Sequence, residues 1–163
     1  MDDAFDCFYR KHLPLIFAAA LAKTADRGHA EDLVQETMLR AWRHFTLLAE
    51  RDVNGQRAWL LTALRHRAIE EWRRQETRAV SEETVIPSGG PAIPSVELGL
   101  DVARALSKLP DTERELVVLR YFHQLNSRDI GEVLGMPEGT VRRKLAEIRA
   151  ALAKQLDEWR DIG

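Results

Sequence analysis

The sequence contains little of what marks a secreted, zinc-binding or membrane-spanning protein. Cysteine occurs once in 163 residues, which excludes an internal disulfide and a cysteine-rich zinc site. The longest apolar run, Leu13 to Ala22, is about half as long as a membrane span and contains Pro14. The N-terminus is acidic, unlike a secretory signal. We therefore expect a cytoplasmic protein with no membrane insertion, in which Cys7 is a small core residue.

Patterns of catalytic or cofactor chemistry are also missing. There is no phosphate-binding glycine loop and no dinucleotide fingerprint, and no two of the five histidines have the i, i+4 spacing that binds a metal from one helix. We therefore expect a protein that is not an enzyme, with no catalytic residues, no cofactor and no metal. The formal net charge is −2, so binding to nucleic acid must depend on local basic faces or on a larger partner.

Hydrophobic periodicity predicts an all-α protein with two small helical domains. The period disappears from Gln75 to about Val96, where prolines and two adjacent glycines indicate a flexible linker. Two helical units are therefore more consistent with the sequence than one continuous core. The predicted boundaries are 1–75 for the first domain, 76–96 for the linker and 97–163 for the second domain.

Within these domains, apolar residues at helical spacing predict the individual helices. Pro14 is expected to kink or split the first of them. Residues 51–56, which are rich in turn-forming types, are expected to form a loop. The predicted helices cover about 3–22, 29–45, 57–74, 98–109 and 111–122, and a helix-turn-helix follows them.

Near the C-terminus, two helices are expected to flank a glycine-containing turn. Ser127 is the expected N-cap of the first helix, Gly135 is expected to end it, and Pro137 suits the first turn of the second helix. One narrow stripe of the second helix is apolar and should be buried. This stripe consists of Val141, Leu145, Ile148 and Leu152.

The side of that helix opposite the apolar stripe combines small and basic residues. Small residues such as Gly139 and Ala146 let the backbone approach DNA, and arginines such as Arg143 can contact guanine edges or phosphates. The alternative is an ordinary solvated helix with surface arginines. The helix, turn and proline that precede it favour a helix-turn-helix whose second helix enters the major groove.

Two predicted helices of the first domain carry unusual exposed faces. The second helix is expected to expose Leu39 within an acidic and polar stripe, which fits a protein-docking surface, although an exposed leucine of no consequence fits equally well. The third helix is expected to bury Leu60 and Trp72 and to present Trp59 with polar and basic groups. Such a face suits single-stranded nucleic acid, and the alternative is that Trp59 belongs to the core.

Three segments together resemble the bacterial RNA polymerase sigma factors. Ala30–Trp42 resembles the helix by which these proteins dock on the polymerase. Trp59–Arg74 resembles their promoter-melting helix. Three short segments resemble parts of their promoter-binding helix-turn-helix domain, namely Leu109–Pro110, Leu119–Tyr121 and Gly139–Arg142. The short length and the missing middle domain resemble the extracytoplasmic-function (ECF) type. The resemblance implies a subunit that directs core polymerase to promoters, recognising their −35 and −10 elements and helping to melt them.

The resemblance also implies three sets of contact residues. The set that would face the clamp coiled coil of the polymerase β′ subunit is Asp32, Gln35, Glu36, Leu39 and Arg40. The set that would hold the non-template strand of the −10 element is Asn54, Trp59, Thr62, His66, Arg73 and Arg74. The set that would dock at the −35 element is Glu138, Gly139, Thr140, Arg142, Arg143, Lys144, Glu147 and Arg149. Further implied partners are the polymerase β flap and an anti-sigma factor, which is common in the resembled family.

Three residues depart from the pattern of the resembled family. His66 stands where asparagine is usual, Glu70 where aspartate is usual, and Glu147 where many relatives carry a basic or neutral side chain. An acid at position 147 repels phosphate unless it accepts a hydrogen bond from a cytosine amine, so we expect it to shift the −35 preference.

Two other functions compete with that of a sigma factor. The first is a sigma-like module that only sequesters an anti-sigma factor, and the basic helix around Arg142 and Arg143 argues against it. The second is a stand-alone helix-turn-helix regulator, which would normally dimerise. It leaves the faces around Leu39 and Trp59 unexplained.

Overall fold

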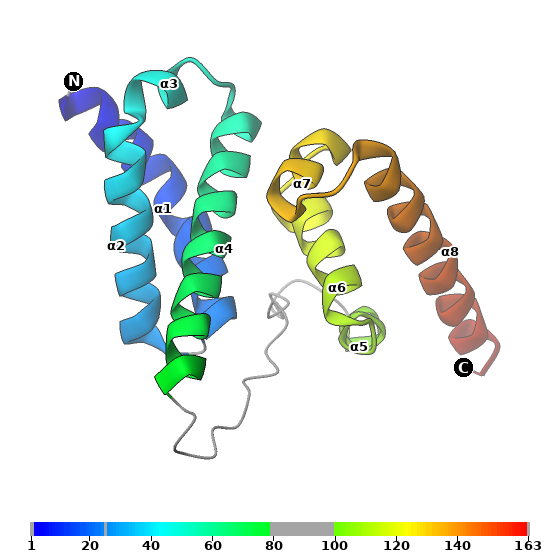
Figure 1. The fold of residues 1–163 in the computed structure, drawn as a ribbon. Helices are drawn as coiled ribbons and strands as arrows, with labels where there is room; N and C mark the ends of the chain where they lie inside the picture. The colour runs from blue at the N-terminus through cyan, green and yellow to red at the C-terminus, as the bar shows by residue number, and fades with distance from the viewer. Residues whose placement is uncertain (1, 25, 79–99, 163) are drawn as a thin grey trace. The chain divides into compact units, whose positions relative to one another are not determined.

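A computed structural model describes residues 2–24, 26–78 and 100–162 (Figure 1). These residues form helices and the turns between them and include no strand, which confirms the all-α class. The chain divides into two compact units, Met1–Gly89 and Gly90–Gly163. In the described part of the chain, no helix has the length and apolar character needed to cross a membrane.

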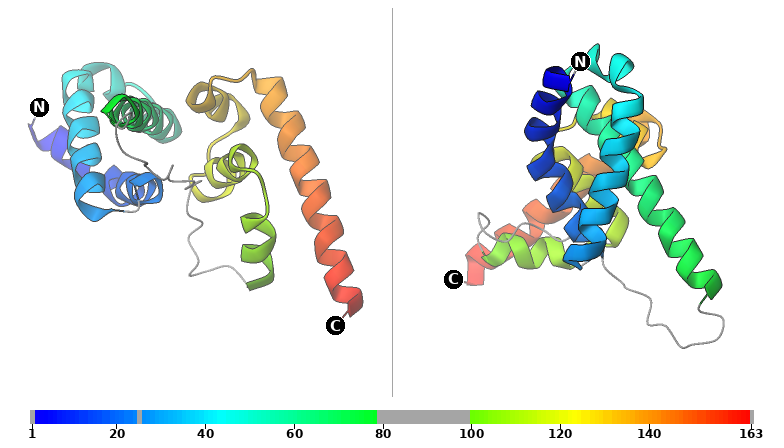
Figure 2. Two further views of the ribbon diagram at one scale, coloured as in Figure 1. Left: turned by 60° about the horizontal axis from the view of Figure 1, so that its bottom comes forward. Right: turned by 90° about the vertical axis from the view of Figure 1, so that its left-hand side faces the viewer.

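Unit 1 contains α1 (Asp2–Thr24), α2 (Arg27–Arg43), α3 (Phe45–Ala49) and α4 (Val53–Arg78). The three long helices pack against one another in pairs, and the short α3 joins α2 to the start of α4 at one end of the bundle (Figures 1 and 2). The apolar residues that recur at helical spacing through the predicted second helix, 29–45, form its buried face. The buried residues of this face are Ala30, Leu33, Val34, Thr37, Met38, Ala41 and Phe45.

The first helix is not split at Pro14, because α1 is continuous from Asp2 to Thr24. Proline removes one backbone hydrogen bond and usually kinks a helix. In α1 the buried residues lie on both sides of Pro14 at intervals of four, so that both halves pack on the same core. These residues are Phe8, His12, Ile16 and Ala20.

The predicted loop over residues 51–56 is wrong for its last four residues. α4 begins at Val53 because Asp52 caps it: Asp52 Oδ1 accepts a hydrogen bond from the Gly55 N–H at 2.7 Å, and the Asp52 carbonyl accepts one from the Gln56 N–H at 2.9 Å. At its other end α4 continues to Arg78. The predicted linker, 76–96, therefore begins with three helical residues, and the rest of it lies outside the described residues.

Two side chains assigned to the core are on the surface. Cys7 is exposed because it lies about 100° around α1 from the buried Phe8. Trp72 is 43% exposed. The end of α4 extends beyond α1 and α2 (Figure 2). Trp72 lines a pocket with Thr24 at the end of α1 and His29 near the start of α2, and these residues cover it only in part.

Unit 2 contains α5 (Leu100–Ser107), α6 (Asp111–Val117), the π-helical turn η2 (Val118–Phe122), α7 (Ser127–Leu134) and α8 (Glu138–Ile162). Arg114 of α6 closes the turn that follows α5. Its guanidinium donates hydrogen bonds to the carbonyls of Leu106 at 3.2 Å, Ser107 at 2.7 Å and Leu109 at 3.0 Å. The Leu106 and Ser107 carbonyls lie at the end of α5, where they have no partner within the helix, and the Leu109 carbonyl lies in the turn itself.

The helix-turn-helix is formed by α7 and α8. Gly135 ends α7 with a left-handed φ of 68°, as predicted. The N-cap of α7 is Asn126 and not Ser127, because Asn126 Oδ1 accepts a hydrogen bond from the Asp129 N–H at 2.8 Å. Pro137 precedes α8, and its carbonyl accepts the first helical hydrogen bond, from the Val141 N–H at 3.1 Å.

Gly131, which the sequence did not single out, determines how closely α7 meets the turn. Its carbonyl accepts a hydrogen bond from the Met136 N–H at 3.0 Å. A β-carbon at Gly131 would lie 2.5 Å from the backbone carbonyl oxygen of Met136, closer than any real contact. A larger side chain would therefore push the turn away from α7.

We expect Gly131→Ala to lower the free energy of unfolding by about 1–3 kcal/mol, the usual cost of overpacking. Gly139→Ala is a suitable control, because no atom lies within 4 Å of a β-carbon added there. Urea titration of the full chain, followed by circular dichroism, measures both variants. Equal stabilities would show that the approach at Gly131 does not constrain the turn.

Candidate functional site

The outer face of α2 borders an apolar groove. Leu39 is 59% exposed. With Gln35 it lines an open groove of about 370 Å³, whose other lining residues are Phe5, Tyr9, Met38 and Trp42. The ring of Phe5 supports one wall through an edge-to-face contact with Trp42, with ring centroids 4.8 Å apart. The structure therefore brings Gln35 and Leu39 of the predicted docking set together.

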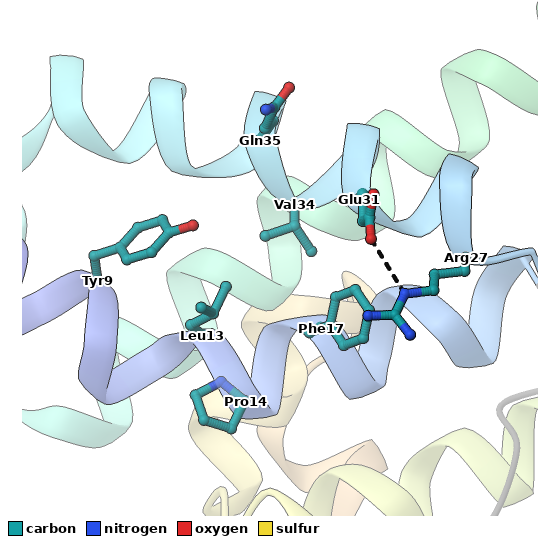
Figure 3. Close-up of a pocket in the computed structure, with 8 residues that line it drawn as sticks. All are labelled: Tyr9, Leu13, Pro14, Phe17, Arg27, Glu31, Val34 and Gln35. Atoms are coloured by element: carbon teal, nitrogen blue, oxygen red, sulfur yellow. Dashed lines mark hydrogen bonds and ion pairs between the residues drawn. The ribbon is translucent and has the colours of Figure 1, made fainter.

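A second groove of about 480 Å³ continues between α1 and α2 (Figure 3). Arg27 and Glu31 form an ion pair at 3.2 Å on its α2 side, and the Arg27 guanidinium lies 5.9 Å from the centre of the Phe17 ring. Because Tyr9 and Gln35 line both grooves, we refer to them together as the α1–α2 groove. The first helix is thus part of a surface that the sequence assigned to the second helix alone.

Glu36, another member of the docking set, is directed toward α4. Both of its carboxylate oxygens accept hydrogen bonds from Arg67, one of them from Nη2 at 3.0 Å. Arg67 also donates to Glu70 at 3.3 Å. The bond to Glu36 raises the pKa of Arg67 above its ordinary value. The remaining members of the set, Asp32 and Arg40, are exposed on α2.

The bidentate ion pair between Arg67 and Glu36 should contribute more to the free energy of unfolding than an ordinary surface ion pair does. Two hydrogen bonds join the groups, and both side chains are partly buried. A double-mutant cycle with Arg67→Met and Glu36→Gln should give a coupling free energy of about 1 kcal/mol, reduced in 1 M salt. The exposed pair Arg27–Glu31 provides the control, for which about 0.3–0.5 kcal/mol is expected. Equal coupling in the two pairs would contradict the structural role of Arg67.

Four residues predicted for the −10 element form one line along α4, namely Trp59, Thr62, His66 and Arg73, and Arg74 lies about 100° around the helix from Arg73. Trp59 is half-buried, with its ring 5.9 Å from that of His44, whereas His66, Arg73 and Arg74 are exposed. The Thr62 hydroxyl donates to the Ala58 carbonyl at 2.7 Å, so it is available to a ligand chiefly as an acceptor. The face therefore combines an aromatic edge, an acceptor and cationic groups.

Asn54 lies apart from this line. It is half-buried in the first turn of α4, and at about 100° per residue it is about 140° around the helix from Trp59. The sequence placed it in a loop because Asn54 and Gly55 are common in turns. The capping by Asp52 makes them helical instead.

The −35 set occupies the exposed side of α8, opposite the stripe that packs in unit 2. Val141, Leu145 and Ile148 are buried, as predicted, whereas Leu152 is only half-buried. Arg142 forms an ion pair with Glu138, one helical turn earlier. Thr140 and Lys144 are half-buried, and the exposed members of the set are Glu138, Gly139, Arg142, Arg143, Glu147 and Arg149.

The exposure of two further large side chains could not be predicted from the sequence. Leu47 of α3 is 67% exposed, and Tyr121 of η2 is 50% exposed. Helical periodicity could not identify them, because α3 and η2 are each too short to show a repeat.

Comparison with known proteins identifies the family. Residues 8–78 match sigma-70 region 2, and residues 99–152 match sigma-70 region 4. The ECF RNA polymerase sigma factor SigL of Mycobacterium tuberculosis is 35% identical over 156 residues, which cover 92% of this chain and 87% of SigL. The chain belongs to the ECF sigma factors. Sigma factors direct RNA polymerase to promoters and are not themselves catalysts.

Other relatives of this sigma factor agree with the assignment. SigW of Bacillus subtilis is 30% identical over 143 residues, covering 78% of this chain and 75% of SigW. The fold is shared with the sigma factor RpoE of Bartonella quintana, solved with the anti-sigma factor NepR, at a TM-score of 0.69 and 24% identity over 94% of this chain and 97% of that one. It is also shared with CnrH, solved with the cytosolic domain of CnrY, at a TM-score of 0.58.

Proposed function

We propose that this sigma factor uses three separate surfaces: the face of α2 with the α1–α2 groove for core polymerase, α4 for the −10 element, and α8 for the −35 element. The observation that carries the proposal is that one chain exposes both an apolar docking face around Leu39 and a basic recognition helix around Arg143. A stand-alone regulator needs only the second of these surfaces, and a decoy for an anti-sigma factor needs only the first.

The proposed partner of α2 is the clamp coiled coil of the polymerase β′ subunit. Leu39 and Gln35 border the α1–α2 groove, which offers an apolar surface to a helical partner. Asp32 and Arg40 lie exposed on the same helix and can provide polar contacts at the rim. We assign Glu36 a supporting role as well, since its bond to Arg67 connects the docking helix to α4.

In unit 2 we propose the β flap as the polymerase partner. The half-exposed Tyr121 of η2 provides an aromatic anchor of the kind enriched at interfaces. An anti-sigma factor is a further proposed partner, because the sigma factor RpoE, which shares this fold, was solved in complex with the anti-sigma factor NepR. The apolar α1–α2 groove provides such a partner with a surface for which polymerase would compete.

For the −10 element we propose capture of unpaired non-template bases by residues 51–56, at the start of α4, and by the face of α4 that follows. Trp59 offers a stacking surface, His66 a hydrogen-bond donor, and Arg73 and Arg74 positive charge for the backbone. Unpairing a base costs a few kcal/mol, and its capture offsets part of that cost. We retain residues 1–75 as the domain that carries this activity.

For the −35 element we propose that α8 enters the major groove. Exposed Gly139 allows a close approach of the helix start, and the exposed arginines reach guanine edges or phosphates. Glu138 holds Arg142 at the start of the helix through their ion pair. Because both DNA-binding domains belong to one chain, binding of one raises the effective concentration of the other at the same promoter.

The first test is in vitro transcription with bacterial core polymerase over fragmented DNA from the source organism. Discrete transcripts are expected from the parent protein. Leu39→Glu should abolish them by placing a charge in the docking face, and Arg143→Ala should reduce them at least tenfold by removing a contact at the −35 element. Leu47→Glu and Arg104→Ala change exposed residues outside the proposed surfaces and should retain transcription. Absence of both transcripts and core binding would contradict the proposal.

A second test concerns the choice of −35 sequence. We expect Glu147→Ala to change the relative affinities of the holoenzyme for a panel of −35 variants by about 1–3 kcal/mol at one base pair. Glu147→Gln separates two causes, because glutamine retains an acceptor for a cytosine amine but not the negative charge. Unchanged relative affinities in Glu147→Ala would exclude a role for this residue in specificity.

A further inference from the structure

A buried histidine connects α1 to the start of α4. His12 is 1% exposed, and its ring lies against Phe8 with centroids 4.7 Å apart. Its Nε2 lies 2.9 Å from Oε1 of Gln56, which is 44 residues away along the chain. Neither residue belongs to the docking set or to either DNA-binding set.

The Gln56 side chain has further bonds that fix the direction of this contact. Its Nε2 donates to the Leu48 carbonyl at 3.0 Å and to the Arg51 carbonyl at 3.2 Å. The amide oxygen is therefore the atom that faces His12, and it can only accept. His12 must donate, so the imidazole carries its proton on Nε2.

The surroundings of His12 keep this ring neutral at pH 7. Burial lowers the pKa of His12 below its ordinary value of 6.5. The bond to Gln56 opposes this shift, and the positive charges of Lys11 and Arg57 add to it. A neutral ring with a fixed tautomer is a well-defined single donor to Gln56.

The carbonyls that Gln56 holds belong to the turn between α3 and α4. Leu48 lies in the last turn of α3, and Arg51 directly precedes Asp52, the cap of α4. Residues 49–52 are exposed, so no apolar packing holds their backbone. The polar network of His12, Gln56 and Asp52, together with the backbone hydrogen bond from the Arg51 N–H to the Leu48 carbonyl at 3.1 Å, thus sets the path of this turn and the point at which α4 begins.

We propose that His12 and Gln56 are positioning residues for −10 recognition, which fix the α3–α4 turn (Glu50–Asp52) and the first turn of α4 against the unpaired strand. This inference rests on the proposed function, since it assumes that the start of α4 contacts the −10 element. Asn54 is the predicted contact nearest to the network, two residues before Gln56. A turn held by these hydrogen bonds presents its backbone to bases in one arrangement, which is a requirement for selective contacts.

The deciding variant is Gln56→Glu. A carboxylate of the same size still accepts a hydrogen bond from His12, but it cannot donate to the Leu48 and Arg51 carbonyls. Gln75→Glu is the matched control, because it makes the same change at an exposed position of the same helix. Holoenzymes are compared in open-complex formation on a parent promoter and on promoters with single substitutions in the −10 or the −35 element.

We expect Gln56→Glu to reduce the preference for the parent −10 element over its variants at least fivefold, while preference among −35 variants and affinity for core polymerase are unchanged. Gln75→Glu should alter complex formation on all promoters by the same factor. A loss of protein stability alone would lower open-complex formation equally on all promoters. The ratio of complex formation on the parent −10 element to that on its variants therefore separates positioning from a general loss of structure.

A second pair of variants tests the network from the α1 side. His12→Phe removes the donor to Gln56 and should also reduce −10 preference, whereas His12→Gln retains an amide donor and should restore part of it. Unchanged −10 preference in Gln56→Glu and His12→Phe would overturn the positioning role. Unfolding of both variants would also overturn it, as would a loss of −35 preference as large as the loss of −10 preference. If the parent holoenzyme shows no −10 preference, the proposed function itself fails.

Discussion

The packing of α2 between α1 and α4 is the constraint on which unit 1 depends. Its apolar face is buried from Ala30 to Ala41, with Leu33 completely covered. A helix has only one such face to bury, so the residues opposite must lie on the surface. The exposure of Leu39 is therefore a consequence of the core, and the α1–α2 groove forms beside it where α1 lies against α2.

Polar contacts between helices fix the relative position and rotation of the helices, which the apolar core alone does not. Apolar packing is tolerant of small rotations and shifts, whereas hydrogen bonds require particular distances and directions. Arg67 and Glu36 fix α4 relative to α2, and His12 and Gln56 fix the start of α4 relative to α1. The proposed DNA-binding helix is thus held at two points by groups whose geometry is specific.

In unit 2 the corresponding constraint is the close approach of backbones at the helix turn. Gly131 allows the Met136 carbonyl to lie against α7, and Gly135 supplies the left-handed residue that ends it. The direction of α8 follows from this turn. With Val141 and Leu145 buried, Arg143 and Glu147 necessarily lie on the opposite, exposed side.

The sequence by itself determined the helical class, the buried faces of α2 and α8, the end of α7 at Gly135 and the family, because all of these depend on local periodicity or on short motifs. Only the tertiary structure decided which polar groups meet, since Glu36 and Arg67 are 31 residues apart and His12 and Gln56 are 44 residues apart. It also showed that Trp72 is exposed, because a helical period gives the direction of a side chain but not where the neighbouring helices end. The same limit applies to Asn54, whose helical position depends on the cap that Asp52 forms.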